Sequence, residues 1–436
     1  MFPYYLRLAR VRLLETRGIS LALVIALGLG IGASMTMLTV VRTMSWDPLP
    51  GRSTALFHPA IDPLPASYEV RAGKDPRVAL SWVDALSFLE RAPAPRQVAL
   101  ASGRLLVSAQ SAVRSPFFAN GQYATGEVFD IFGITLVSGR SWTREEDAGR
   151  ARVVVLGDAL ARRLGGEDSV LGKSVTLGGH AFQVIGVAED WRPRPRFHTD
   201  LQQEVFNGTE DFFLPLRTAM ELQLNVANSV FSWSTSSSGN RLEDPSTAWL
   251  QYWVELPTDS QRDAYQRFLV GYVREQVAQG RFDRSAPPRL WSLKEYLVQA
   301  HIIPNEVKLQ LALCVAFLIV CLLNMSALIF ARFQQRTHEI SIRRALGARR
   351  GDIIGQLCTE AAIIGVIGGC VGLLVAQAGL YLVRRQPEDY AALASMDLYM
   401  VGATLVVACG CSLLAALFPA LRATSGRLAM QIKASE

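Results

Sequence analysis

The segment EISIRRALGARRGDII, residues 339–354, lies between two stretches that are apolar enough to enter a lipid bilayer. It combines four arginines with apolar residues that recur at helical spacing. Ile342, Ala345 and Leu346 would form one apolar edge of a helix, while the arginines stay in water. A surface loop needs only polar residues, so this ordered edge predicts a short amphipathic helix on a membrane surface.

The flanking stretches belong to a set of four candidate membrane spans, because the hydrocarbon core requires about 20 mostly uncharged residues. The spans are residues 19–41, 309–330, 353–383 and 398–421, and the third begins with a polar turn before its charge-free part at 361–383. The first span is long for a secretion signal, and its small residues lie inside the apolar run. We therefore expect it to be an uncleaved membrane helix.

The distribution of charge predicts the orientation of these spans. Basic residues outnumber acidic ones in residues 1–18, in 331–352 and in 422–436, whereas the long stretch 42–308 is balanced. By the positive-inside rule, both termini and the 331–352 segment face the cytoplasm. Residues 42–308 and the short 384–397 loop then face the other side. The net charge of +6 therefore reflects the orientation of the chain in the membrane and does not indicate nucleic-acid binding.

The 42–308 stretch is long enough to bury a core of its own. It holds none of the six cysteines, so no disulfide within it stabilises the fold. Apolar alternation and turn residues predict strands at 96–110, 153–156, 173–177, 181–187 and 249–256, and helices at 81–93, 159–164 and 260–279. The predicted fold is a membrane protein with four transmembrane α-helices and a large α+β extracytoplasmic domain inserted between the first and second helices.

Two motifs in this domain have competing interpretations. GEDSVLGKS, residues 166–174, resembles a phosphate-binding loop, but five residues separate its glycines where a Walker A loop has four, and a strand follows instead of a helix. A tight turn is the favoured interpretation. WRPRPRF, residues 191–197, is a basic, proline-stiffened strip that would contact a partner or anionic lipid headgroups, or would lie as a solvated loop. No Cys/His cluster predicts a metal site, and no catalytic set is present.

Small and polar residues within the spans indicate helix packing. The pairs Gly28/Gly32 and Gly368/Gly372 each have the spacing that lets two helices approach closely, within one chain or between two chains. Asn324 in the second span predicts a hydrogen bond across helices, because an unpaired amide is costly in lipid. A contact with substrate is the alternative.

The arginine-rich segment has two interpretations on physical grounds alone. It is either an interfacial helix on anionic lipid or a docking helix that a cytoplasmic motor grips. The longer stretch RTHEISIRRALGARRGDIIGQLCTEAAIIGVIGGCVGLL, residues 336–374, resembles the signature of the FtsX-like permeases, the membrane subunits of MacB-type (type VII) ABC transporters. It departs from the family pattern mildly, at His338 and Ser341. Residues 126–190 likewise resemble the MacB-like periplasmic core domain.

This resemblance implies a fold, a mechanism and partners. Relatives are dimers of four-helix subunits that transmit ATP-driven movement to the extracytoplasmic domain without a channel. Residues 331–352, which we name the coupling segment, would dock on a separate ABC ATPase subunit dimer, since a membrane helix follows almost directly on Met1. The ATPase-coupling residues would be Glu339, Ile340, Ile342, Arg343, Arg344, Ala345, Leu346 and Gly347.

We therefore expect the permease subunit of a MacB-like exporter in the bacterial inner membrane. Its substrate would be a peptide, antibiotic, lipid or lipoprotein, with no enzyme activity or cofactor on this chain and with ATP and magnesium on the partner. Partners would be a second permease copy, membrane lipids and, in some systems, a periplasmic adaptor and an outer-membrane channel. The alternative is an FtsX-like signal transducer that activates an extracytoplasmic partner such as a cell-wall hydrolase. Lipoprotein extraction shares the same architecture.

Overall fold

A computed structural model of the chain forms two compact units, the helical unit (Met1–Ser45 and Ile303–Glu436) and the inserted domain (Trp46–Ile302). The structure describes residues 17–68, 79–108, 115–166, 170–200, 205–206, 208–234, 239–283, 286–335, 342, 350–386 and 390–425.

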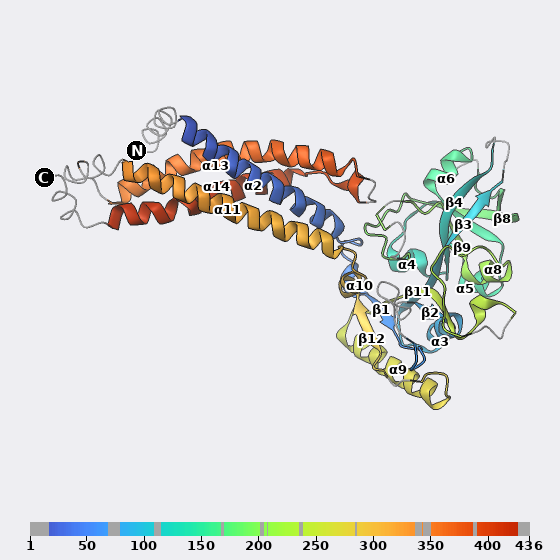
Figure 1. Cartoon of the computed structure of the whole chain (residues 1–436). Coiled ribbons are helices and arrows are strands. Elements are labelled where there is room, and N and C mark those ends of the chain that lie inside the picture. Colours follow the sequence, from blue (N-terminus) through green and yellow to red (C-terminus); the bar gives the residue numbers. More distant parts are fainter. Residues whose placement is uncertain are drawn as a thin grey trace. The chain divides into compact units, whose positions relative to one another are not determined.

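Four of the described helices are long and apolar enough to cross a membrane. They are α2 (Arg17–Met44), α11 (Asn305–Gln335), α13 (Arg350–Val383) and α14 (Leu398–Ser425), shown in Figure 1. α13 packs along both α2 and α14, and α11 also contacts both of these helices. The helices therefore form a bundle, and the predicted set of four transmembrane helices is confirmed.

The helices are longer than the apolar spans from which they were predicted. α11 has 31 residues and α13 has 34, whereas about 20 suffice to cross the hydrocarbon. Their extra turns are polar, and the first turns of α11 and α13 contain Glu306 and Asp352. The inserted domain accordingly ends at Ile302, a few residues before the predicted boundary.

Hydroxyl groups inside the bundle bond to their own helices. Thr36 Oγ1 donates to the Gly32 carbonyl at 2.8 Å, and Thr39 Oγ1 donates to that of Met35 at 2.7 Å. Because no water reaches the centre of a bilayer, a polar group there needs such an internal partner. Because of these internal hydrogen bonds, Thr36 and Thr39 can lie inside a helix whose composition is apolar overall.

The inserted domain is built on a mixed sheet with the strand order β12-β1-β11-β3-β4-β9-β6-β8-β5, to which β2, β7 and β10 are added at the sides. The strands are β1 (Leu56–Ala60), β2 (Leu80–Ser81), β3 (Arg96–Val107), β4 (Phe117–Ala124), β5 (Leu136–Gly139), β6 (Val153–Gly157), β7 (Ser174–Leu177), β8 (His180–Ala188), β9 (Phe212–Pro215), β10 (Phe231–Ser232), β11 (Thr247–Glu255) and β12 (Arg289–Ser292). The β4–β9 and β6–β8 pairs are parallel, whereas the other pairs are antiparallel.

Helices cover this sheet and complete the α+β domain. They are α3 (Trp82–Arg91), α4 (Val128–Phe132), α5 (Arg144–Ala148), α6 (Asp158–Arg163), α8 (Leu216–Glu221), α9 (Asp259–Ala278) and α10 (Leu293–Gln299). The predicted strands and helices lie within a few residues of β3, β6, β7, β8, β11, α3, α6 and α9. The β7–β8 hairpin turns at Gly178 and Gly179, whose φ angles of 57° and 86° favour glycine.

Two hydrophobic cores form on the two faces of the sheet, and β11 contributes to both. Tyr252 faces the first core, where it meets Phe88 of α3, and the next residue, Trp253, faces the second core. Successive strand residues point to opposite faces, so a strand that is buried on both faces is apolar throughout. For this reason the apolar run of β11 does not alternate with polar residues.

Candidate functional site

The predicted glycine pairs meet within the bundle. Gly28 and Gly32 of α2 lie against Gly368 and Gly372 of α13. A Cβ at Gly28 would lie 2.6 Å from Val371 Cγ1, and one at Gly32 would lie 2.9 Å from the Gly372 carbonyl oxygen. Both distances are below van der Waals contact, so a side chain here would force the helices apart. The two pairs therefore pack against each other within one chain.

α13 also presents small residues to a second helix. A Cβ at Gly369 would lie 2.9 Å from Ala408 Cβ of α14. On the side that faces α2, a Cβ at Gly379 would lie 2.7 Å from Thr36 Oγ1. α13 is thus in close contact on two sides, with α2 on one and with α14 on the other. We name this double contact the glycine seam. Close backbone approach makes such contacts short and stiff.

α11 differs from the other helices because little of it is covered. Among the 18 consecutive residues of α11 that are most apolar, 17% are buried, compared with 56% in the corresponding stretch of α2. Asn324 lies on the exposed side of α11, and no hydrogen bond joins its side chain to a described residue. The predicted hydrogen bond across helices is thus not formed within the part of the chain that the structure describes.

Buried polar residues occupy the end of the bundle from which the coupling segment emerges. Arg332 of α11 is only 4% exposed, and its Nη2 donates to Ser20 Oγ of α2 at 2.7 Å. Glu360 of α13 is equally buried and accepts from Gln356 Nε2 at 3.3 Å. Burying a charge is costly, and ionisable residues inside a membrane bundle are usually functional. This site was not predicted from the sequence, because Arg332 was counted only among the basic charges of residues 331–352 and Glu360 lies in the polar turn at the start of the third predicted span.

The opposite end of the bundle carries an ion pair. Arg42 of α2 donates to Asp397, just before α14, at 3.1 Å, and its guanidinium lies 4.7 Å from the centre of the Tyr399 ring. Tyrosine is frequent where a helix leaves the hydrocarbon. Both ionic side chains are partly exposed, so the pair adds little to stability and marks a polar boundary instead.

Most of the predicted coupling residues lie outside the described residues. These are Glu339, Ile340, Arg343, Arg344, Ala345, Leu346 and Gly347. Ile342 is described, and its side chain is 49% exposed. The amphipathic helix and its docking role therefore stay predictions.

In the inserted domain, the strip of residues 191–197 packs against the second core. The Trp191 ring stacks on Phe132 with centroids 5.6 Å apart, and Phe197 is fully buried edge-on to Trp253. Its arginines Arg192 and Arg196 pair with Asp190 and Glu210. The apolar residues of the strip are thus part of the folded domain, while Arg192 and Arg194 are exposed to solvent.

A buried carboxylate holds the chain that follows this strip. Glu210 accepts hydrogen bonds from Arg196, from His198 Nε2 at 2.9 Å and from Gln122 Nε2 at 3.1 Å. Burial alone would raise the pKa of Glu210, but the Arg196 charge and the His198 hydrogen bond outweigh it and lower the pKa to about 2. Burial also lowers the pKa of His198, so this imidazole is neutral at pH 7. The cluster is buried inside the folded domain, where its hydrogen bonds hold these segments together.

The described part of the GEDSVLGKS motif, residue 166 and residues 170–174, includes a tight turn that leads into β7. The Lys173 N–H donates to the Val170 carbonyl at 3.0 Å, and Gly172 has a φ angle of 75°. A strand, β7, follows directly at Ser174. A phosphate-binding loop would lead into a helix whose N-terminus faces the phosphates, so the local structure agrees with the tight-turn interpretation.

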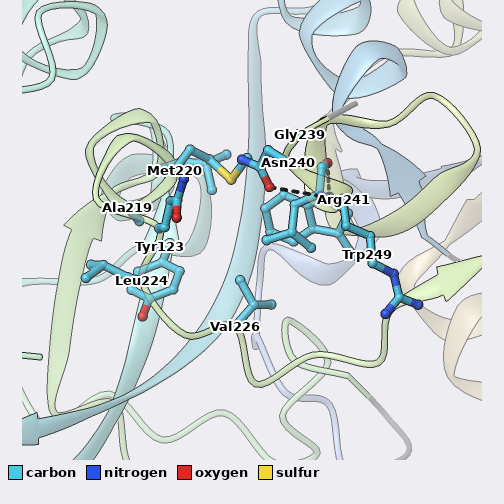
Figure 2. Close-up of a pocket in the computed structure, with 12 residues that line it drawn as sticks. Tyr123, Ala219, Met220, Leu224, Val226, Gly239, Asn240, Arg241 and Trp249 are labelled. Carbon is cyan, nitrogen blue, oxygen red and sulfur yellow. Dashed lines mark hydrogen bonds between the residues drawn. The ribbon is translucent and has the colours of Figure 1, made fainter. Parts of the chain in front are cut away.

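The inserted domain also contains a cavity of about 230 Å³ between α8 and the short 3₁₀ helix η3 (Arg241–Glu243). Figure 2 shows Met220, Leu224 and Tyr123 on one side and Trp249 on the other, with Val226 between them. The Tyr123 hydroxyl donates to the Asn225 carbonyl at 2.9 Å, and Trp249 Nε1 donates to that of Leu242 at 2.8 Å. The polar atoms of both aromatic residues are thus satisfied, and apolar surface remains to line the cavity.

This cavity was not predicted from the sequence. Its walls come from β4 and, much later in the chain, from α8, η3 and β11, and its lining residues follow no spacing pattern. Only a fold that brings these elements together reveals it.

Two family models match the chain. The MacB-like periplasmic core domain matches residues 20–267, and the FtsX-like permease C-terminal model matches residues 311–427. A macrolide export ATP-binding/permease protein MacB 1/2 of Paracoccus denitrificans is 27% identical over 300 residues, which are 68% of this chain and 39% of that protein. MacB of Escherichia coli K12 is 26% identical over 58% of this chain and 34% of its own length. The chain thus spans between a third and two fifths of these two relatives.

Two solved structures also align with part of the chain. The periplasmic region of MacB from Actinobacillus actinomycetemcomitans aligns with a TM-score of 0.38 and 16% identity, covering 58% of this chain and 94% of that one. The extracellular domain of the noncanonic ABC-type transporter YknZ from Gram-positive bacteria aligns with a TM-score of 0.35 and 13% identity, covering 54% of this chain and 99% of that one.

Proposed function

This chain belongs to the family of FtsX-like permeases with a MacB-like periplasmic core domain, and from that premise we propose that it transmits the movements of a separate ABC ATPase to its inserted domain. The two matched regions are a core domain and a permease, whereas the curated relatives are named ATP-binding/permease proteins. We propose that ATP and magnesium bind to the partner and that this chain performs no chemistry itself.

The glycine seam is the observation that carries this proposal. The coupling segment lies between α11 and α13, so a force on it would act on both helices. α13 contacts α2 backbone-to-side-chain at Gly28 and Gly32, and α2 continues within two residues into the inserted domain. A stiff contact between α13 and α2 would pass a displacement onward instead of absorbing it.

The polar cluster at the coupling end would support the same route. The buried hydrogen bond from Arg332 to Ser20 joins α11 to α2 at the end where a motor would act. The three helices would then move as one body. The exported substrate would be handled by the inserted domain on the far side of the membrane, with both termini in the cytoplasm.

The relatives' names point to macrolides as the first substrate class to test, ahead of peptides, other antibiotics, lipids and lipoproteins. We propose that the chain acts as a dimer with a second permease copy in the bacterial inner membrane. A periplasmic adaptor and an outer-membrane channel would complete an exporter. The findings favour export over signalling to a cell-wall hydrolase.

A substitution in the coupling segment tests the proposal. In the complex reconstituted with its ATPase in lipid, Ile342→Asp is expected to abolish substrate-stimulated ATP hydrolysis, because it places a charge on the apolar docking edge. Val137→Asp in the inserted domain is the matched control, since both side chains are 49% exposed. Unchanged stimulation in the Ile342 variant would contradict the proposed coupling role.

A further inference from the structure

Most side chains that line the cavity shown in Figure 2 are apolar, polar atoms contribute at least as much of its open surface, and Arg241 gives it one cationic edge. Leu216, Met220 and Leu224 come from α8 and the turn after it, and all three are buried. Arg241 is the one charged residue among the described lining residues, and no carboxylate is present there to neutralise it.

Arg241 is held at the edge of the cavity by its own hydrogen bond. Its Nε donates to Ser232 Oγ at 3.2 Å, and Ser232 Oγ is 2.7 Å from Thr247 Oγ1. Its two terminal nitrogens form no hydrogen bond or ion pair with a described residue, and the side chain is exposed. Figure 2 shows the guanidinium extending past Trp249. A guanidinium fixed through Nε keeps two donors that match a carboxylate.

The other side of the cavity combines adaptable and strained residues. Met220 is unbranched and polarizable, which suits it to contacts with ligands of more than one shape. Gln223 lines the rim with a φ angle of 50°, in the left-handed region that non-glycine residues rarely adopt. Such backbone strain is found disproportionately at ligand-binding positions.

We propose that this cavity binds an apolar group that carries a carboxylate, with the apolar group between Met220 and Trp249 and the carboxylate on Arg241. The volume of about 230 Å³ fits a single aromatic or branched side chain and excludes a large ring system. The C-terminal residue of a peptide and a small apolar acid share this chemistry. The site does not depend on the proposed transport function, since its occupancy is measurable without an ATPase.

Fluorine NMR on the full chain in lipid nanodiscs tests the site. The probe is N-acetyl-4-fluoro-L-phenylalanine, and its line broadening reports binding. We expect this probe to bind with a Kd below about 1 mM and the corresponding amide to bind roughly tenfold more weakly. N-acetylglycine, which lacks an apolar side chain, should compete more weakly than the amide. Equal binding of acid and amide, or no binding of the acid up to about 10 mM, would overturn the proposal.

Two variants locate the bound probe. Arg241→Gln is expected to weaken binding of the acid about tenfold and to leave the amide unchanged, because only the acid uses the charge. Arg104→Gln is the matched control, since Arg104 lies on β3 over the Phe118 ring and outside the cavity. Met220→Trp, which fills the cavity, is expected to remove binding of both probes. Equal effects of the two arginine variants, or full binding to the filled cavity, would contradict the assignment.

A peptide pair then separates the two sources of the ligand. A tetrapeptide that ends in 4-fluorophenylalanine is compared with the same peptide bearing a C-terminal amide. If the free peptide binds at least as tightly as the N-acetyl amino acid, the site takes peptide C-termini. If it binds much more weakly, the site takes small apolar acids.

Discussion

The helical unit and the inserted domain are stabilised by opposite kinds of contact. In the bundle, glycines let α2 and α13 approach closely, so that Val371 and Val375 of α13 pack directly against the backbone of α2. In the domain, large aromatic side chains fill the second core, where Trp253 lies edge-on to Phe197 and to Tyr296. The difference shows that one sequence uses small residues where a membrane removes the hydrophobic driving force, and large residues where water supplies it.

The same division provides separate reporters for the two units. All eight tryptophans lie in the inserted domain, and all six cysteines lie in the membrane helices. Tryptophan fluorescence therefore follows unfolding of the domain, while the reactivity of the thiols toward a maleimide follows opening of the bundle. A single sample can thus report which unit a substitution affects.

Truncation of the aromatic core is expected to have the largest effect. Trp253 is fully buried among three rings, so Trp253→Ala should lower the free energy of unfolding of the domain by about 3–5 kcal/mol. Thermal melting followed by tryptophan fluorescence measures this change. Trp46→Ala is the control, because Trp46 is 51% exposed and its loss should cost less than about 0.5 kcal/mol. Similar losses for both variants would contradict the packing described here.

A single methyl group in the glycine seam is expected to have the next largest effect, and in the other unit. Gly32→Ala should destabilise the bundle by about 1–3 kcal/mol, because its Cβ would overlap Val375 and the Gly372 carbonyl. Faster maleimide labelling with unchanged tryptophan melting is the expected result. Gly410→Ala adds the same methyl on α14 where no atom lies within 4 Å, and it should leave labelling unchanged. Equal labelling of the two variants would refute the seam.

A buried carboxylate in the domain offers an effect of similar size and opposite sign. Burial raises the pKa of Asp147 from 3.8 to about 6. The folded state therefore binds the proton more tightly than the unfolded state, and this contribution to stability is lost as the pH rises through 6. Asp147→Asn should then stabilise the domain by roughly 1–3 kcal/mol at pH 7.5 and give little gain at pH 4, as measured by tryptophan melting. A gain that is the same at both pH values would rule out this origin.

Much of the fold was predictable from the sequence because its strongest signals are local. The charge-free spans predicted the four membrane helices, and the local apolar pattern predicted the strands β7 and β8, which form a hairpin around Gly178 and Gly179. The glycine spacing indicated close packing but did not identify the partner helix, since periodicity on one helix contains no information about the helix that it faces. Only the structure showed that Gly32 meets Gly372.

The functional features that the sequence did not reveal depend on long-range contacts. Arg332 and Ser20 are 312 residues apart in the chain, and neither lies in a recognisable motif. Asn324 was expected to face another helix, but the rotation of α11 places it on the exposed side. The cavity beside Trp249 requires four elements to converge. In each of these cases the tertiary arrangement decides the chemistry, and sequence spacing alone does not.

The central claim is that the coupling segment is the attachment point of an ATP-hydrolysing partner. Purification of the tagged chain from native membranes tests it most directly, with wild type compared with Leu346→Asp at equal membrane abundance. We predict that an ABC ATPase accompanies the wild-type chain in near-stoichiometric amount and is lost from the variant. Recovery of the wild-type chain without any ABC ATPase, or retention of the ATPase by the variant, would contradict the account.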